Sequence, residues 1–134
     1  MKKCLVTGGC GFIGSNYIRY VLEKEDDLHI VNLDKLTYAG NRHNLDGIPE
    51  TFHSFIEGDI CDAELVKHLF NEHQFDAVVH FAAFAYVGES VTDPAKYYLN
   101  NLAGPLVLLE AMRRHGCANF IFSSTCATYG NPQY

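Results

Sequence analysis

The sequence predicts an α/β fold with a doubly wound parallel sheet. Short apolar runs alternate along the chain with segments whose apolar residues recur at helical spacing. The first apolar run breaks into clustered glycines, Gly8, Gly11 and Gly14, and a helical pattern follows at once. Asp34 closes the second run, twenty residues after Gly14. With right-handed crossovers this alternation predicts the Rossmann-like strand order 3-2-1-4-5, truncated after the fifth strand.

Five strands are expected, separated by helices or loops. Their ranges are Lys3–Thr7, Leu28–Leu33, Thr51–Glu57, Ala77–Phe81 and Asn119–Ser124. The second is mostly apolar, which is typical of a parallel sheet covered on both faces. The segment from Asp34 to Pro49 is rich in Gly, Asn and Asp, so we expect a loop with one short helical turn.

Helices are expected where polar caps precede apolar patterns. The first spans Phe12–Lys24, and Asp62 caps a second. Asp93-Pro94 is a strong start for a third helix, which runs to about His115. Gly104-Pro105 lies inside it, and an internal proline costs about 3 kcal/mol, so we expect a kink or two abutting pieces.

Composition restricts the partners. The 134 residues suit one domain, and 48% hydrophobic with 19% charged residues describes a globular chain. A net charge of −6 argues against nucleic acid or an anionic membrane as the main partner. The five cysteines are an odd number without a C-x-x-C pair, and the N-terminus enters a strand directly; both favour a reducing cytoplasm. The seven histidines have no metal-ligand spacing, so no metal is expected.

The glycine cluster predicts a dinucleotide site. One glycine permits the tight turn, one lets the backbone approach a pyrophosphate, and one allows close packing of helix on strand. The free N–H groups at the helix start, with the helix dipole, favour bound phosphate. The residues expected to contact the cofactor here are Gly8, Gly11, Phe12, Ile13 and Gly14. The alternative is a structural β–α turn that binds nothing.

Asp34 points to NAD as the cofactor. At this spacing a carboxylate accepts hydrogen bonds from the ribose hydroxyls. A 2′-phosphate there would meet a like charge, at a cost of up to about 4 kcal/mol at contact for an effective dielectric near 20. Lys35 could soften this preference, and Asp34 could instead be a loop-capping residue.

The motifs resemble those of extended short-chain dehydrogenases/reductases that act on nucleotide sugars. The pattern Thr-Gly-Gly-x-Gly-Phe-Ile-Gly at 7–14 is specific for that group. The first half, with the stretches 32–41 and 58–62, resembles dTDP-glucose 4,6-dehydratases. The second half, with 80–83, 87–90, 97–101 and 120–130, resembles UDP-glucose 4-epimerases.

The resemblance implies further site residues. Asp59 and Ile60, at the end of the third strand, would flank the adenine, and Asn100 would hold the nicotinamide-side ribose. Thr125 would orient a sugar hydroxyl and is the catalytic-motif residue that this chain retains. The other expected cofactor contacts are Lys35, Phe81, Ala82, Ala83 and Ser123. Many epimerases have a lysine at the position of Ala85, and its absence here weakens the expected retention of NAD.

The residues after Thr125 favour an epimerase. Dehydratases have an Asp-Glu pair there that supplies acid and base for the loss of water, whereas this chain has Cys126 and Ala127. An epimerase needs no such pair, since it takes a hydride from the sugar C4 and returns it to the other face.

The resemblance also implies a missing part. The family's catalytic Tyr-x-x-x-Lys lies on the helix after the fifth strand, and neither Tyr129 nor Tyr134 has a lysine four residues on. We therefore expect 1–134 to be a single NAD-binding domain without the C-terminal substrate domain, inactive alone, taking a nucleotide sugar only if that part is supplied. A dehydratase portion and a stand-alone dinucleotide-binding module are the alternatives. A homo-oligomer built near 120–134 is also expected.

Overall fold

A computed structural model, describing residues 1–131, contains one five-stranded parallel sheet. The strand order β3-β2-β1-β4-β5 confirms the predicted topology. The strands are β1 (Lys2–Thr7), β2 (Leu28–Asp34), β3 (His53–Glu57), β4 (Ala77–His80) and β5 (Asn119–Phe122). Because the chain order reverses between β1 and β4, their carboxyl ends flank the switch point where open α/β sheets bind ligands.

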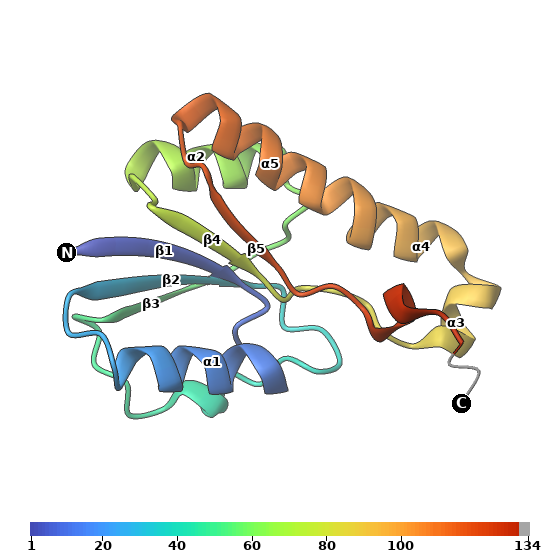
Figure 1. Ribbon diagram of the computed structural model, residues 1–134, viewed down its shortest axis with the longest axis horizontal. Helices are drawn as coiled ribbons and strands as arrows, with labels where there is room; N and C mark the ends of the chain where they lie inside the picture. Colours follow the sequence, from blue (N-terminus) through green and yellow to red (C-terminus); the bar gives the residue numbers. More distant parts are fainter. Residues whose placement is uncertain (132–134) are drawn as a thin grey trace.

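Helices cover both faces of the sheet (Figure 1). Helix α1 (Phe12–Leu22) lies on one face, whereas α2 (Ala63–Glu72) and α5 (Gly104–His115) lie side by side on the other. Alternate residues of β1 serve the two cores: Leu5 packs with the α2 and α5 side, and Val6 with the α1 side. Both are fully buried, which explains why the central strands are apolar runs.

The predicted third helix is built from abutting pieces. It starts with α4 (Pro94–Tyr98), where the Asp93 carboxylate accepts from the Lys96 N–H at 3.4 Å. A π turn, labelled η2 (Leu99–Ala103), joins it to α5. The π turn accommodates Pro105, which has no N–H to donate. Gly116 ends α5 with φ 70°, a left-handed conformation that glycine adopts without a steric penalty.

Other boundaries differ modestly from the expectation. The Asp62 cap is confirmed: its carboxylate accepts from the N–H groups of Glu64 and Leu65. The short helical turn expected in the 34–49 loop is η1 (Arg42–Leu45). A helix that the sequence did not predict, α3 (Val87–Thr92), follows β4, and η3 (Cys126–Tyr129) follows β5. Asp59 and Ile60 were wrongly placed at a strand end, because β3 stops at Glu57 and the chain then turns into α2.

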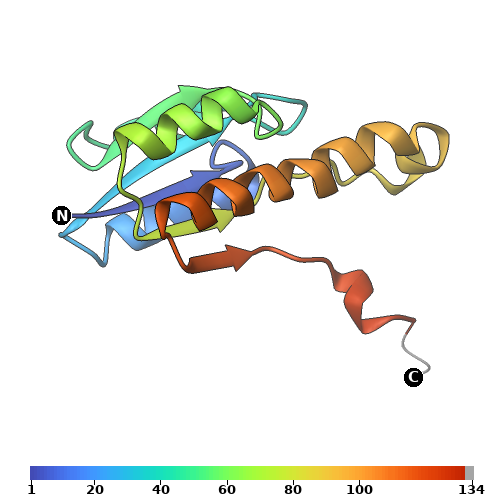
Figure 2. The same ribbon diagram turned by 90° about the horizontal axis from the view of Figure 1, so that it is seen from above.

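Figure 2, seen from above, shows β5 as an outer strand and the segment after it leaving the sheet. The apolar side chains of β5 are only partly covered: Ile121 is 58% and Phe122 51% exposed. The Ser123 N–H still donates to the His80 carbonyl at 3.1 Å, which holds the start of the departing segment against β4.

His80 is buried at the carboxyl end of β4. Its Nδ1 lies 2.5 Å from the Thr7 hydroxyl oxygen, and its ring stacks on Phe122 with centroids 5.5 Å apart. Burial lowers the pKa of His80 to about 4, so the imidazole is neutral at pH 7. The hydrogen bond therefore joins β1 to β4 through a neutral pair.

We expect His80 to make folding stability pH-dependent. Because its pKa is lower folded (about 4) than unfolded (6.5), the unfolded chain binds more protons between these values, and stability falls as pH falls. From pH 7 to pH 5 the loss from this group is about 2 kcal/mol. In urea unfolding, the stability advantage of wild type over His80→Asn should shrink by that amount. An advantage equal at both pH values would contradict this assignment.

Candidate functional site

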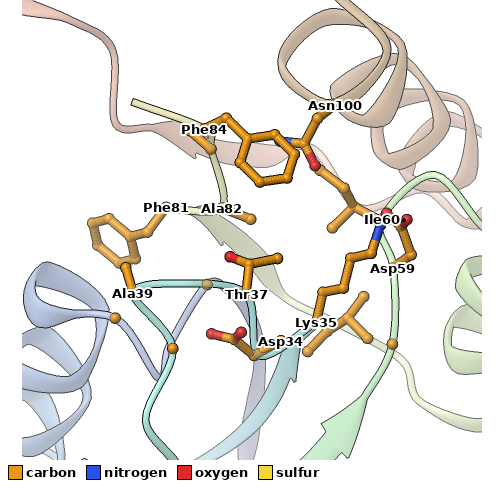
Figure 3. A pocket seen from close by; sticks show the side chains of 16 residues that line it. Asp34, Lys35, Thr37, Ala39, Asp59, Ile60, Phe81, Ala82, Phe84 and Asn100 are labelled. Carbon is orange, nitrogen blue, oxygen red and sulfur yellow. Dashed lines mark hydrogen bonds and ion pairs between the residues drawn. The ribbon is translucent and has the colours of Figure 1, made fainter. Parts of the chain in front are cut away.

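A pocket lies at the carboxyl edge of the sheet, at the switch between β1 and β4 (Figure 3). Its walls come from the glycine turn after β1, the loop after β2, the turn after β3, the segment after β4 and the π turn. The lining residues are Gly8, Gly11, Leu33, Asp34, Lys35, Thr37, Ala39, Gly40, Gly58, Asp59, Ile60, Phe81, Ala82, Ala83, Phe84 and Asn100.

The three glycines of the turn differ in what packing requires of them. Gly8 has φ 73°, and a Cβ on it would lie 2.5 Å from the backbone nitrogen of Ala82. A Cβ on Gly14 would lie 2.7 Å from the Cα of Gly9, so this glycine lets α1 pack on the turn. Gly11 is different, since its Cβ would meet nothing closer than the Gly8 carbonyl oxygen at 3.5 Å. Protein packing thus leaves Gly11 free to carry a side chain, and the space beside it belongs to the pocket.

Asp34 lies at the base of the pocket and is 7% exposed. One carboxylate oxygen accepts from the Cys10 N–H at 2.8 Å, and the other accepts from the Leu36 N–H at 2.8 Å. The loop-capping role considered for this residue is therefore present. A carboxylate has about four acceptor positions, so two further hydrogen bonds remain possible on the pocket side.

Lys35 and Asp59 form an ion pair across one end of the pocket, with Nζ 2.5 Å from Oδ2. Figure 3 shows the Lys35 side chain extending to Asp59. Partial burial acts to raise the pKa of Asp59, but hydrogen bonds from Lys35 and the Cys61 N–H outweigh it, so the pKa lies below its usual range. The carboxylate is thus ionised at neutral pH, and the pair ties the loop after β2 to the turn after β3.

The structure brings together most residues that the sequence singled out. Those in the pocket wall are Gly8, Gly11, Asp34, Lys35, Asp59, Ile60, Phe81, Ala82, Ala83 and Asn100. Gly14 is buried beneath the turn and does not line the pocket. Phe12 and Ile13 lie on the first turn of α1 and are 81% and 60% exposed.

Sequence reasoning missed six wall residues, namely Leu33, Thr37, Ala39, Gly40, Gly58 and Phe84. Gly40 had a detectable signal, because it stands in a Gly- and Asn-rich loop; a Cβ there would lie 3.0 Å from the Asp34 carboxylate. Phe84 had none, since nothing in its local pattern shows that its ring faces Thr37 and Asn100 (Figure 3).

Ser123 and Thr125 line a second, neighbouring hollow, which shares Ala82, Ala83 and Phe84 with the first pocket. Thr125 caps η3 by accepting from the Ala127 N–H at 3.2 Å. The hollow is also lined by Tyr97, whose hydroxyl donates to Glu89 at 2.7 Å.

Tyr97 is unsuited to act as a base. Burial of its hydroxyl and the hydrogen bond to Glu89 raise the pKa of Tyr97 to about 12. The spacing Tyr-x-x-x-Lys does occur in this chain, at Tyr20 and Lys24, so its expected absence holds only for the stretch after β5. Tyr20 lies in the last turn of α1 and Lys24 follows the end of that helix, at the sheet edge opposite the pocket.

Within residues 1–131, no three His, Cys, Asp or Glu side chains are grouped so that they could hold a metal ion. Over the same residues, no helix combines the length and the apolar character needed to cross a membrane.

The strand order, the glycine turn and the carboxylate at the end of β2 define a Rossmann-type α/β protein with its ligand pocket at the topological switch point. The chain belongs to the GDP-mannose 4,6-dehydratase family, whose model matches residues 5–134. The expected membership in the nucleotide-sugar epimerases and dehydratases of the extended short-chain dehydrogenase/reductase group is confirmed.

Both branches of that group are represented among the similar proteins. A UDP-glucose 4-epimerase of Mus musculus is 42% identical over all of this chain and 40% of its own length. The dTDP-glucose 4,6-dehydratase 1 of Escherichia coli K12 is 46% identical over 87% of this chain and 32% of its own. The solved UDP-glucose 4-epimerase from Brucella ovis in complex with NAD is 42% identical and superimposes with a TM-score of 0.86 over all of this chain and 39% of its own. The chain thus spans roughly a third to two-fifths of these relatives.

We expect Gly11→Ala and Gly14→Ala to separate ligand binding from folding. Gly11→Ala should change unfolding stability by less than about 0.5 kcal/mol, yet weaken dinucleotide binding at least tenfold, measured by NADH titration. Gly14→Ala should cost about 1–3 kcal/mol through overpacking. Gly88→Ala is the matched control, since a Cβ there meets no atom within 4 Å. Unchanged NADH affinity in Gly11→Ala would refute the assigned role of Gly11.

Proposed function

We propose that the chain is the NAD-binding portion of a nucleotide-sugar 4-epimerase, folded as a single domain over residues 1–134. The observation that carries the proposal is the pocket itself, where the unencumbered backbone at Gly11 and the carboxylate of Asp34 line one cavity. The backbone at Gly11 would bind phosphate, and the Asp34 carboxylate would accept hydrogen bonds from ribose hydroxyls in the same cavity.

The residues that would hold NAD follow from their positions. The glycine turn, with Phe12 and Ile13 at the start of α1, would receive the pyrophosphate, and Asp34 the adenine-side ribose. Asp59 and Ile60 would flank the adenine, and Asn100 the other ribose. The epimerase from Brucella ovis and the dehydratase from Bacillus anthracis were both crystallised with NAD, which supports this cofactor.

We expect NADH to bind at least tenfold more tightly than NADPH, measured by calorimetry. A 2′-phosphate would approach the Asp34 carboxylate, and Lys35 is already paired with Asp59. Asp34→Ala should also loosen the loop that Asp34 caps, so the informative quantity is the ratio of the two affinities, which should fall toward one. Asp26→Ala removes an exposed carboxylate from the opposite edge of the sheet and should leave the ratio unchanged. Retained discrimination in Asp34→Ala would exclude Asp34 as its source.

The epimerase assignment rests on the segment after β5. Cys126 and Ala127 are exposed on η3 directly after Thr125, and neither provides the acid–base couple that water elimination needs. When bound, NAD supplies a hydride acceptor for the sugar C4. Thr125 and Ser123 would orient the sugar in the second hollow. A 4,6-dehydratase portion is the second candidate, favoured by the resemblance of the first half of the sequence.

We expect no conversion of UDP-galactose by this chain alone, followed by chromatography of the nucleotide sugars. Tyr97 is the tyrosine that lines the same hollow as Thr125, and its raised pKa of about 12 opposes proton abstraction at neutral pH. Turnover by protein free of other epimerases would overturn this expectation. A stand-alone binding module would also bind without turnover; an in-frame Tyr-x-x-x-Lys in the genomic DNA beyond codon 134 would favour the epimerase instead.

The proposal includes self-association and a cytoplasmic location. The half-exposed Ile121 and Phe122 on outer strand β5 support a homo-oligomer built on that side of the sheet. The proposed contact also includes 132–134, which lie outside the described residues. All five cysteines have free thiols, which supports a reducing compartment.

A further inference from the structure

Tyr38 connects two segments that form separate walls of the NAD pocket. It lies between the wall residues Thr37 and Ala39, in the loop after β2. Its hydroxyl accepts a hydrogen bond from the Ala85 N–H at 3.1 Å, across 47 residues of sequence. Its ring also stacks on Tyr86, with centroids 4.3 Å apart and planes inclined by 25°. Ala85 and Tyr86 directly follow the wall residue Phe84, so these contacts join the two walls beside the pocket.

The wall after β4 is firmly anchored. Asn101 on the π turn accepts from the Phe84 N–H at 2.9 Å and donates to the Phe84 carbonyl at 2.8 Å. The Lys96 ammonium lies 4.5 Å from the centroid of the Phe84 ring, and Phe84 also contacts Tyr97. Tyr38 therefore contacts a wall that Asn101 and Lys96 hold in place.

The loop that carries Tyr38 is anchored on both sides of it. Lys35 is tied to Asp59, and the Asn41 N–H donates to the Cys10 carbonyl at 3.0 Å. Between these anchors, Tyr38 is 48% exposed and Tyr86 is 56% exposed, so their contact lies at the surface. Tyr38 also stacks on Phe84, with ring centroids 6.2 Å apart. The neutral hydrogen bond and each of the two aromatic pairs change an equilibrium by about fivefold, which permits thermal opening.

We propose that Tyr38 is a latch on the NAD pocket: the cofactor enters and leaves when Tyr38 separates from Ala85 and Tyr86. The inference rests on the proposed binding of NAD. The latch spans the two walls and stays closed in the free protein, so it slows association and dissociation alike.

Stopped-flow fluorescence of NADH with Tyr38→Phe tests the latch. Phenylalanine keeps the ring and removes the acceptor for the Ala85 N–H. Both the association and the dissociation rate constants should rise about fivefold, and the dissociation constant should stay within about twofold. In the protein without NADH, hydrogen exchange at the Ala85 amide, followed by NMR, should accelerate by a similar factor. Tyr20→Phe, the same change at an exposed tyrosine of α1, should alter neither quantity.

The outcomes distinguish the latch from other roles of Tyr38. Faster exchange at Ala85 with unchanged NADH rates would overturn the latch while leaving NAD binding in place. A rise in dissociation rate alone would also overturn it, since that is the signature of a direct cofactor contact. If the wild-type chain bound no NADH, the proposed function would fail, and the latch would fail with it as a cofactor gate. The Ala85 exchange rate would still report whether the bond forms.

Discussion

The close approach of the α1 N-terminus to the end of β1 is the constraint on which the rest of the site depends. Gly8 turns the chain in a left-handed conformation against the backbone of Ala82, and Gly14 lets the helix pack on the turn. A side chain at either position would separate β1, α1 and β4 at the point where the pocket forms. The glycines therefore act first on packing. Gly11, which packing does not require, lines the pocket beside Gly8 and has space on the side where a ligand would bind.

The charged groups around the pocket have structural roles that overlap with the binding roles proposed for them. Asp34 caps its own loop through Leu36 and holds the glycine turn through Cys10, yet it also faces the cavity. The Lys35–Asp59 pair similarly joins two loops while forming one end of the same cavity. A group so placed is well positioned before any ligand arrives, which lowers the cost of ordering it on binding. Because Asp34 both holds its loop and faces the cavity, its replacement is expected to change stability and affinity together.

The loop after β2 and the segment after β4 meet at the pocket. The loop lines it with Asp34 and Thr37, and the segment lines it with Phe84. Beside the pocket, the ring of Tyr38 in the loop stacks on Phe84 and on Tyr86, so the two segments are in direct contact. The site is therefore continuous across segments that are far apart in the sequence.

The sequence alone determined the elements and their order, because local rules govern them. The short apolar runs, the Asp62 cap and the glycine turn each depend on residues near one another in the chain, and each is present in the structure. Features that join distant segments were decided only by the tertiary structure. These include the Tyr38–Ala85 bond, the ring of Phe84 in the pocket wall and the burial of His80 between Thr7 and Phe122. The start of β3 and the π turn before Pro105 belong with them, since sheet pairing and helix packing, rather than propensity, set the bounds of those elements.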